Sequence, residues 1–241
     1  MLRKLYHLAL AVGVVLSFLL PSVSNASIII NGTRVIYPGS EKEVTVKLSN
    51  NGKQPVLVQS WVDNGDISAK PEKIAVPFIL TPPVNRIEPD KSQTLRLSYT
   101  GSPRLPEDRE SVYWLNVLEI PPAKQNVPNR LQMAFRTRIK LFYRPAAIAD
   151  KVKAAEAAEK ITWSIVGNEL QANNASPYYV SLVSINVDQG SKKSTVAGNM
   201  ISPMGKLSFK LKGDASLVHG ASLSYEYIND WGAVKTVKSV L

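Results

Sequence analysis

Few side chains of this sequence could carry out chemistry. The 241-residue chain contains no cysteine and only two histidines, His7 and His219. Thiol nucleophiles, disulfides and thiolate metal sites are therefore excluded, and no His or Asp cluster has the spacing of a metal site. A serine hydrolase would have to combine His219 with neighbours such as Asp214 and Ser216, but closeness in sequence is not triad geometry and no nucleophile-elbow pattern is present. We therefore expect no enzyme, no metal and no cofactor.

A second group of candidate residues is a row of cations. Arg136, Arg138 and Lys140 occupy every second position of one segment, and Arg144 follows four residues later. The whole chain carries 29 Lys+Arg against 19 Asp+Glu, a formal net charge of +10. Residues spaced by two lie on one face of a β-strand, so the row could bind an anionic partner such as nucleic acid. A row of this kind is more often a solvated face, and no glycine-rich phosphate loop accompanies it.

Residues 1–26 have the pattern of an export signal. Arg3 and Lys4 give a basic start, residues 8–20 are apolar, and small residues lead up to Ala26. The alternative, a membrane anchor, needs an apolar run of about 20 residues, and this run is shorter. We therefore expect a signal peptide that is cleaved after Ala26 and a mature protein that is exported; the resemblance described below implies the periplasm. Because exported proteins rarely meet nucleic acid, no nucleic-acid partner is expected.

The elements that must position the cations are β-strands. Segments rich in β-branched and aromatic residues, such as 43–48, 55–62, 93–99 and 112–120, are separated by turns rich in Pro, Gly and Asn. Several of them alternate apolar and polar residues, which is typical of antiparallel strands with one buried face. The sequence therefore predicts an all-β protein built from β-sandwiches.

The strands fall into two blocks, which indicate two domains. The first block spans residues 27–145 and the second spans 161–241. Between them, residues 146–160 are rich in alanine and charge. They could form a short helical turn but lack a convincing apolar face, so we predict a linker. Without cysteine, each exported domain must be stable through its packed core alone.

One predicted strand is unusually long. Residues 129–143 contain no Gly, Pro or Asp, and at ~3.3 Å per residue they would form a strand about 50 Å long, more than twice the usual length. Its odd positions include Leu131, Met133 and Phe135. A strand longer than its domain leaves apolar residues over the edge, which is an aggregation hazard unless another chain covers them. The alternative is that these three side chains fill the core of their own domain.

At this point several stretches resemble a known family. The sequence is similar to the periplasmic chaperones of the chaperone–usher pathway, typified by the P-pilus and type 1 pilus chaperones. The similarity runs over essentially the whole mature chain and is carried by six stretches: residues 33–50 (TRVIYPGSEKEVTVKLSN), 77–97 (PFILTPPVNRIEPDKSQTLRL), 105–122 (LPEDRESVYWLNVLEIPP), 138–148 (RIKLFYRPAAI), 173–182 (NNASPYYVSL) and 227–233 (YINDWGA). The resemblance implies two immunoglobulin-like domains arranged as an L, with a cleft between them.

The resemblance also implies a function for the long strand. Chaperones of this family lend a strand to a pilus subunit that lacks its own last strand, which is donor-strand complementation. The matching donor residues here are Leu131, Met133 and Phe135, with Asn129 at the far end. The connection over residues 121–128 is short, which resembles the short-loop subclass of the family.

Two cations match the family's cleft residues. Arg34 lies in TRVIYP and Lys140 lies in RIKLFYRP, and the resemblance implies that they clamp the C-terminal carboxylate of the subunit. Two cations in a partly desolvated cleft can bind one carboxylate through charge-assisted hydrogen bonds. Such an anchor would set the register of strand pairing, because a slip by one residue turns the donor side chains away from the groove.

A further set of matched residues is expected to hold the domain angle. Glu110, Arg144 and Asp230 occupy the positions of an interdomain charge network in the family. The implied partners are pilus subunits and an outer-membrane usher, and self-association of the free chaperone stays open. The alternative function is a secreted two-domain sandwich that binds a glycan or receptor, as an adhesin would.

Overall fold

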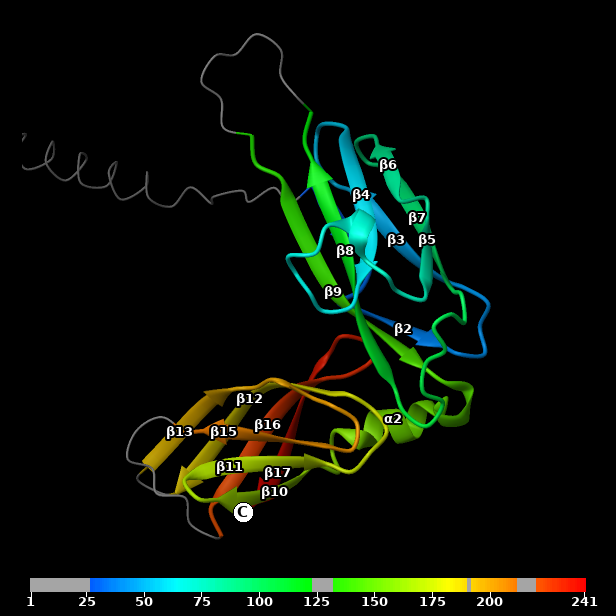
Figure 1. Ribbon diagram of the computed structural model, residues 1–241. Helices are drawn as coiled ribbons and strands as arrows, with labels where there is room; N and C mark the ends of the chain where they lie inside the picture. The colour runs from blue at the N-terminus through cyan, green and yellow to red at the C-terminus, as the bar shows by residue number, and fades with distance from the viewer. Residues whose placement is uncertain (1–26, 123–131, 190–191, 212–219) are drawn as a thin grey trace, which may run out of the picture.

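The protein consists of two β-sandwich domains that meet at an angle, as in an L (Figure 1). The computed structural model describes residues 27–122, 132–189, 192–211 and 220–241. This architecture confirms the predicted all-β, two-domain immunoglobulin-like fold. No helix among these residues is long and apolar enough to cross a membrane. The predicted signal peptide, the donor residues Asn129 and Leu131, and His219 lie outside the described residues.

Two sheets form the N-terminal domain. The four-stranded sheet has the order β1-β3-β7-β5, and the five-stranded sheet has the order β2-β9-β8-β4-β6. The strands, in chain order, are β1 (Ile28–Ile30), β2 (Arg34–Pro38), β3 (Val44–Asn50), β4 (Val56–Asp63), β5 (Phe78–Thr81), β6 (Val84–Ile87), β7 (Ser92–Tyr99), β8 (Ser111–Ile120) and β9 (Phe135–Arg144), with a short 3-10 helix η1 (Pro71–Lys73) after β4.

The first two strands lie in different sheets. β1 pairs antiparallel with β3 in one sheet, whereas β2 pairs parallel with β9 in the other. Alternating side chains of both sheets then fill a common core, with Leu48 and Leu97 of one sheet and Leu115 and Leu141 of the other among its fully buried residues. The switch matters for the site because it places β2 beside the second half of β9.

The C-terminal domain is a second sandwich. Its strands are ordered β10-β11-β15 in one sheet and β13-β12-β16-β17 in the other, where β14 also pairs with β12. Their bounds are β10 (Thr162–Val166), β11 (Glu169–Asn174), β12 (Val180–Gln189), β13 (Lys192–Ala197), β14 (Met200–Ile201), β15 (Gly205–Lys210), β16 (Ser222–Ile228) and β17 (Val234–Val240). Leu170, Ile185 and Leu223 are fully buried at its centre.

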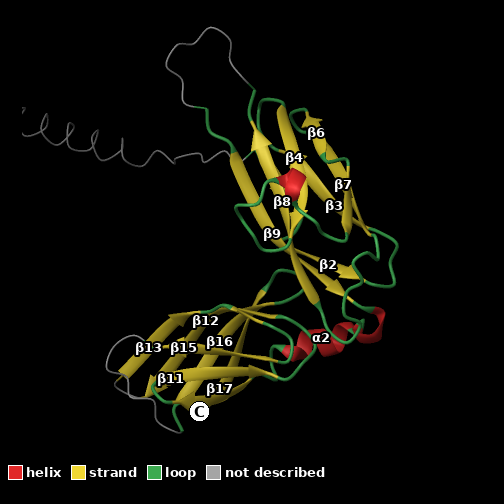
Figure 2. Ribbon diagram, viewed as in Figure 1, coloured by secondary structure: helices red, strands yellow, loops and turns green. Residues whose placement is uncertain are grey.

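Part of the predicted linker packs into the C-terminal domain. Residues 146–160 contain a 3-10 helix, η2 (Ala146–Ile148), and the helix α2 (Lys151–Ala157), which lies beside the junction of the two domains (Figure 2). The helix begins where the carboxylate of Asp150 accepts hydrogen bonds from two backbone N–H groups. Its last turn is buried in the C-terminal core through small side chains, Ala157 and Ala158. The segment predicted as a linker therefore contains the short helix that its composition allowed, and this helix packs through small alanines rather than through a wide apolar face.

The long strand begins later than the sequence predicts. β9 starts at Phe135, whereas the prediction has one strand from residue 129; residues 132–134 are described but belong to no strand. The reason is the partner: the last residue pair between β8 and β9 joins Glu119 to Phe135, and β8 ends one residue later. The described residues before Phe135 therefore have no neighbouring strand in the isolated chain.

Candidate functional site

Two cations from adjacent strands meet where the domains join. The parallel register of β2 and β9 pairs Arg34 with Lys140. Arg34 Nη1 donates a hydrogen bond of 3.0 Å to the carbonyl of Ile228, and Lys140 Nζ donates one of 3.3 Å to Ser181 Oγ. Both acceptors belong to the C-terminal domain. The two cationic groups therefore lie in the cleft between the domains.

These two cations form no ion pair with any acid in the part of the chain that the structure describes. Within the described residues, neither Arg34 nor Lys140 has an acidic oxygen within 4.0 Å, and the buried Nε of Arg34 has no hydrogen-bond acceptor. Burial lowers the pKa of Arg34, although the charges of Asp230 and Glu110 oppose the shift. Burial and the positive charge of Arg34 together lower the pKa of Lys140. A carboxylate entering from outside would satisfy both groups.

A small pocket lies beside Arg34, and the rest of its wall comes from residues 154–230. Its wall includes Arg34, Ser181 and Tyr227 together with the turn that carries Asp230. Arg34 also stacks over the ring of Phe142, 5.6 Å from the ring centroid. The pair thus lies in a cleft with aromatic and polar walls, where water screens a charge less than it does on an open surface.

The predicted charge-network residues are in contact with one another. Arg144 Nε lies 2.8 Å from Glu110 Oε1, and Arg144 Nη1 lies 2.9 Å from Asp230 Oδ2. The second Glu110 oxygen accepts a hydrogen bond of 2.8 Å from the backbone N–H of Tyr179. Burial lowers the pKa of Arg144, but the hydrogen bonds and charges of Asp230 and Glu110 outweigh it and raise that pKa. The network joins the residue before β8 and the last residue of β9 to two loops of the other domain.

The remaining cations of the row are compensated by an acid that was not predicted from the sequence. Arg138 makes two hydrogen bonds to the carboxylate of Asp63, and Arg136 Nη2 lies 3.6 Å from the same group. Asn116 donates a further hydrogen bond of 2.7 Å to Asp63. Arg138 also stacks on Trp114, 4.6 Å from the ring centroid. No local pattern marks Asp63, because its partners lie 53 and 75 residues away in sequence.

The start of β9 and the segment just before it expose apolar side chains. Met133 is 56% exposed and Phe135 is 57% exposed, so the alternative that they fill their own core is wrong for these two. Farther along β9, Leu141 and Tyr143, at the same alternate positions as Phe135, are buried in the core. Because β2 pairs only with the second half of β9, the edge at residues 135–139 has no partner among the described strands.

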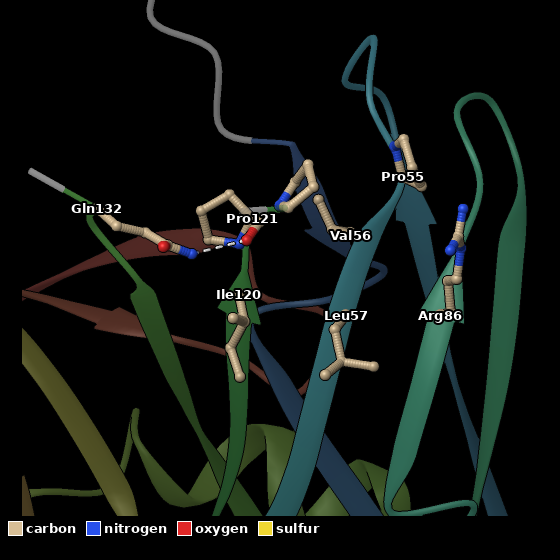
Figure 3. A pocket seen from close by; sticks show the side chains of 8 residues that line it. Pro55, Val56, Leu57, Arg86, Ile120, Pro121 and Gln132 are labelled. Carbon is tan, nitrogen blue, oxygen red and sulfur yellow. Dashed lines mark hydrogen bonds between the residues drawn. The ribbon is translucent and has the colours of Figure 1, made fainter. Parts of the chain in front are cut away.

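The opposite end of the N-terminal domain holds an open, largely apolar pocket (Figure 3). It is lined by Pro55, Leu57 and Ile120, together with Val56, Arg86, Pro121, Pro122 and Gln132. Gln132 Nε2 donates a hydrogen bond of 2.9 Å to the carbonyl of Pro121, which ties the segment before β9 to the end of β8. These residues were not predicted as a site from the sequence, since they come from four segments that are far apart in the chain.

Comparison with known proteins decides the family. Residues 27–149 match the family model described as "Pili and flagellar-assembly chaperone, PapD N-terminal domain", and residues 156–239 match "Pili assembly chaperone PapD, C-terminal domain". The chain belongs to this family of pilus-assembly chaperones. The family consists of non-enzymatic periplasmic chaperones, and membership confirms the resemblance drawn from the six sequence stretches.

Individual members of the family are similar along most of the chain. The probable fimbrial chaperone YadV of Escherichia coli K12 is 46% identical over 219 residues, which cover 88% of each chain. The crystal structure of a YadV chaperone superposes with a TM-score of 0.77 at 41% identity and covers 89% of this chain and 100% of that one. A structure described as Salmonella enterica SafA pilin in complex with the SafB chaperone gives a TM-score of 0.74 at 29% identity, with coverages of 91% and 99%.

Proposed function

We propose that this pilus-assembly chaperone captures fimbrial subunits in the periplasm, completes them by donor-strand complementation and delivers them to an outer-membrane usher. It catalyses no reaction and needs no cofactor. The observation that carries the proposal is the position of the uncompensated pair, Arg34 and Lys140, beside the open edge of β9. An adhesin-like binding module would require neither feature.

The cation pair anchors one end of the subunit. The subunit's C-terminal carboxylate accepts hydrogen bonds from Arg34 and Lys140, whose present acceptors are neutral oxygens of Ile228 and Ser181. A hydrogen bond to a charged group contributes about 1.5–3 kcal/mol, which is about tenfold or more in affinity. Because Arg34 and Lys140 are opposite each other across two strands, the anchored carboxylate fixes one register along β9.

The open edge of β9 then completes the subunit. A strand of the subunit pairs with the free N–H and C=O groups of residues 135–139, and apolar side chains at alternate positions enter the subunit's groove. Met133 and Phe135 are the described members of this set, and we assign Leu131 and Asn129 to its continuation. Pairing would extend the strand beyond Phe135, since it supplies the partner that β8 no longer provides.

The charge network fixes the position of the two domains relative to each other and so sets the width of the cleft. Arg144 joins Glu110 of the N-terminal domain to Asp230 of the C-terminal domain, and Phe142 contacts Tyr179 across the same junction, with ring centroids 5.8 Å apart. We assign these residues to positioning the C-terminal domain relative to the cation pair. Neither Glu110 nor Arg144 is free to bind a ligand, because both are already paired.

The anchor is tested by removing each cation. Lys140→Ala and Arg34→Ala should each lower the amount of subunit that co-purifies with the chaperone from periplasm by tenfold or more, at unchanged chaperone levels. Lys47→Ala, which removes an exposed lysine of β3, is the matched control and should retain the subunit. Full recovery of the subunit with both cleft variants would overturn the assignment of the carboxylate clamp.

The donor strand is tested separately at Met133. Met133→Asp should abolish binding of the subunit, since it would place a charge in an apolar groove, whereas Met133→Leu should preserve it. Because Met133 is exposed, neither substitution should impair folding of the free chaperone. The midpoint of urea unfolding checks this. Equal binding by both variants would remove Met133 from the donor set.

A further inference from the structure

The first described residue is held tightly at the end of β8. The Glu119 carboxylate accepts hydrogen bonds from the hydroxyl of Ser27 and, at 3.1 Å, from the backbone N–H of Ile28. On its other side, the carbonyl of Ser27 accepts a hydrogen bond of 2.7 Å from the backbone N–H of Asn51. A Cβ atom at Gly52 would lie only 2.6 Å from the Cβ of Ser27, so glycine is required for this close approach. These hydrogen bonds and this close contact fix the position of Ser27 at the end of β8.

Among the described residues, the Glu119 carboxylate forms no ion pair, although Lys53 lines the same pocket. Within the described residues, no Lys or Arg nitrogen lies within 4.0 Å of the Glu119 carboxylate. Its only described hydrogen-bond donors are the hydroxyl and the N–H of the two residues that begin the domain. A half-buried carboxylate with neutral donors alone gains further stabilisation from a nearby positive charge.

Processing would create that charge at the same place. The expected cleavage after Ala26 makes Ser27 the first residue, and the family match also begins at residue 27. In a serine, the α-nitrogen and the hydroxyl oxygen are about 3 Å apart, because only two carbon atoms separate them. The new α-ammonium group would therefore form within about 5 Å of the carboxylate that already binds the hydroxyl.

We propose that Glu119 is the binding site of the mature N-terminus, and that signal-peptide cleavage completes it by forming an ion pair between the Ser27 ammonium and the Glu119 carboxylate. The inference depends on the cleavage position and not on the binding of pilus subunits. Glu119 pairs across the sheet with Phe135, the first residue of β9. The ion pair thus ties the start of the mature chain to the strand end from which the donor segment departs, a contact that the precursor lacks.

The first test is the identity and acidity of the terminus. Intact mass should show that the periplasmic protein begins at Ser27; another start would overturn the proposal. The α-amino pKa, followed by NMR after reductive methylation with ¹³C-formaldehyde, should lie about one unit above its ordinary value of about 7.7–8.0. Glu119→Gln should return it to that value, whereas Glu169→Gln, at an exposed residue of β11, should leave it raised. An ordinary value in the unaltered protein would overturn the ion pair.

The second test separates the ion pair from a purely structural role of Glu119. If the α-amino pKa is higher in the folded than in the unfolded protein, the ion pair contributes its full stabilisation at any pH below the unfolded-state pKa. This stabilisation is lost as the pH rises through the folded-state pKa. Glu119→Gln should therefore lower Tm by about 3 °C at pH 6 and by much less at pH 10. A chain that retains Ala26, with its ammonium one residue farther away, should show no such pH dependence. If the Tm loss is equal at both pH values, or equal in both chains, the hydrogen bonds alone explain Glu119.

Discussion

The row of cations on β9 has two parts: Arg136 and Arg138, which face a buried acid of the same domain, and Lys140, which does not. Arg136 and Arg138 lie on the outer face against Asp63, a carboxylate with no exposed side-chain surface. Lys140, two residues farther, lies beside a second cation, Arg34, and finds only neutral oxygens. Residues of one type on one face of one strand therefore serve two purposes. The compensated half stabilises the strand, and the uncompensated half is available to a ligand.

The neighbouring elements explain the difference. Asp63 is the last residue of β4 and pairs with Trp114 of β8, so its carboxylate lies within the same sheet as Arg138. The hydrogen-bond acceptor of Lys140 belongs to the other domain, which Asp230 joins to Arg144 of β9. Compensation of the first half is thus built into the N-terminal sheet. In the second half, the nearby acid Asp230 is paired with Arg144 instead.

The largest expected effect is at Asp63. Asp63→Asn should lower the free energy of unfolding by about 3 kcal/mol at pH 7, because it leaves two partly buried arginines without their acid. Burial raises the pKa of Asp63, but hydrogen bonds from Arg138, Asn116 and the Gly65 N–H outweigh it and lower that pKa. The stabilisation is therefore present above an unfolded-state pKa of about 3.9 and is lost as the pH falls through the lower folded-state value.

Urea unfolding at pH 7 and pH 2 measures this prediction. Asp66→Asn, at an exposed neighbouring acid, is the control and should change the free energy of unfolding by less than about 0.5 kcal/mol. A cost below about 1 kcal/mol for Asp63→Asn at pH 7 would show that the two halves of the row do not differ in this way.

The next prediction concerns the stability of cleft variants. Lys140→Met should leave the free energy of unfolding unchanged or raise it by up to about 1 kcal/mol, because a half-buried cation beside Arg34 is removed. Arg138→Met should lower it by about 2 kcal/mol, since Asp63 loses its closest partner. Urea titrations of the two variants under one condition give the comparison. Equal losses would mean that both cations are structural.

The sequence singles out Arg34 and Lys140 as a pair. It does not show that these two cations lack an acidic partner whereas Arg136 and Arg138 have one. The motifs around Arg34 and Lys140 are local and carry the family resemblance, and the alternation along β9 predicts one cationic face. Which cations are compensated depends on long-range pairing. Asp63 is 75 residues from Arg138 in sequence, and nothing in its own segment indicates that the sheet brings them together.

The two errors of detail have a similar origin. Residues 132–134 have the composition of a strand, but a strand needs a partner, and β8 ends at Ile120. Residues 146–160 lack an apolar helical face, yet Ala157 is buried because the C-terminal sandwich offers space for a small side chain. Composition states what a segment could form, and the neighbouring element decides whether it does.

A smaller effect separates arginine from lysine in the outer half. Arg138→Lys keeps the charge but loses the two-pronged contact with Asp63 and the stacking on Trp114. We expect the free energy of unfolding to fall by about 1 kcal/mol, less than for Arg138→Met. Urea unfolding checks the order of the three proteins. An Arg138→Lys variant as unstable as Arg138→Met would show that geometry, rather than charge, determines the compensation of Asp63.

The smallest effect is a change in the acidity of Lys140. Burial lowers its pKa first and the charge of Arg34 lowers it further, so the free protein should show a Lys140 signal that titrates below the ordinary lysine range. A synthetic peptide that copies the C-terminus of a pilus subunit should raise this pKa, because its carboxylate supplies the missing negative charge, whereas the same peptide with an amidated end should not. Arg34→Gln should raise the pKa in the free protein only in part, since burial remains. NMR of ¹³C-methylated lysines, assigned with Lys140→Arg, follows each case. If the free-acid and amidated peptides act alike, the uncompensated half of the row does not select a carboxylate, and the difference between the two halves is one of stability alone.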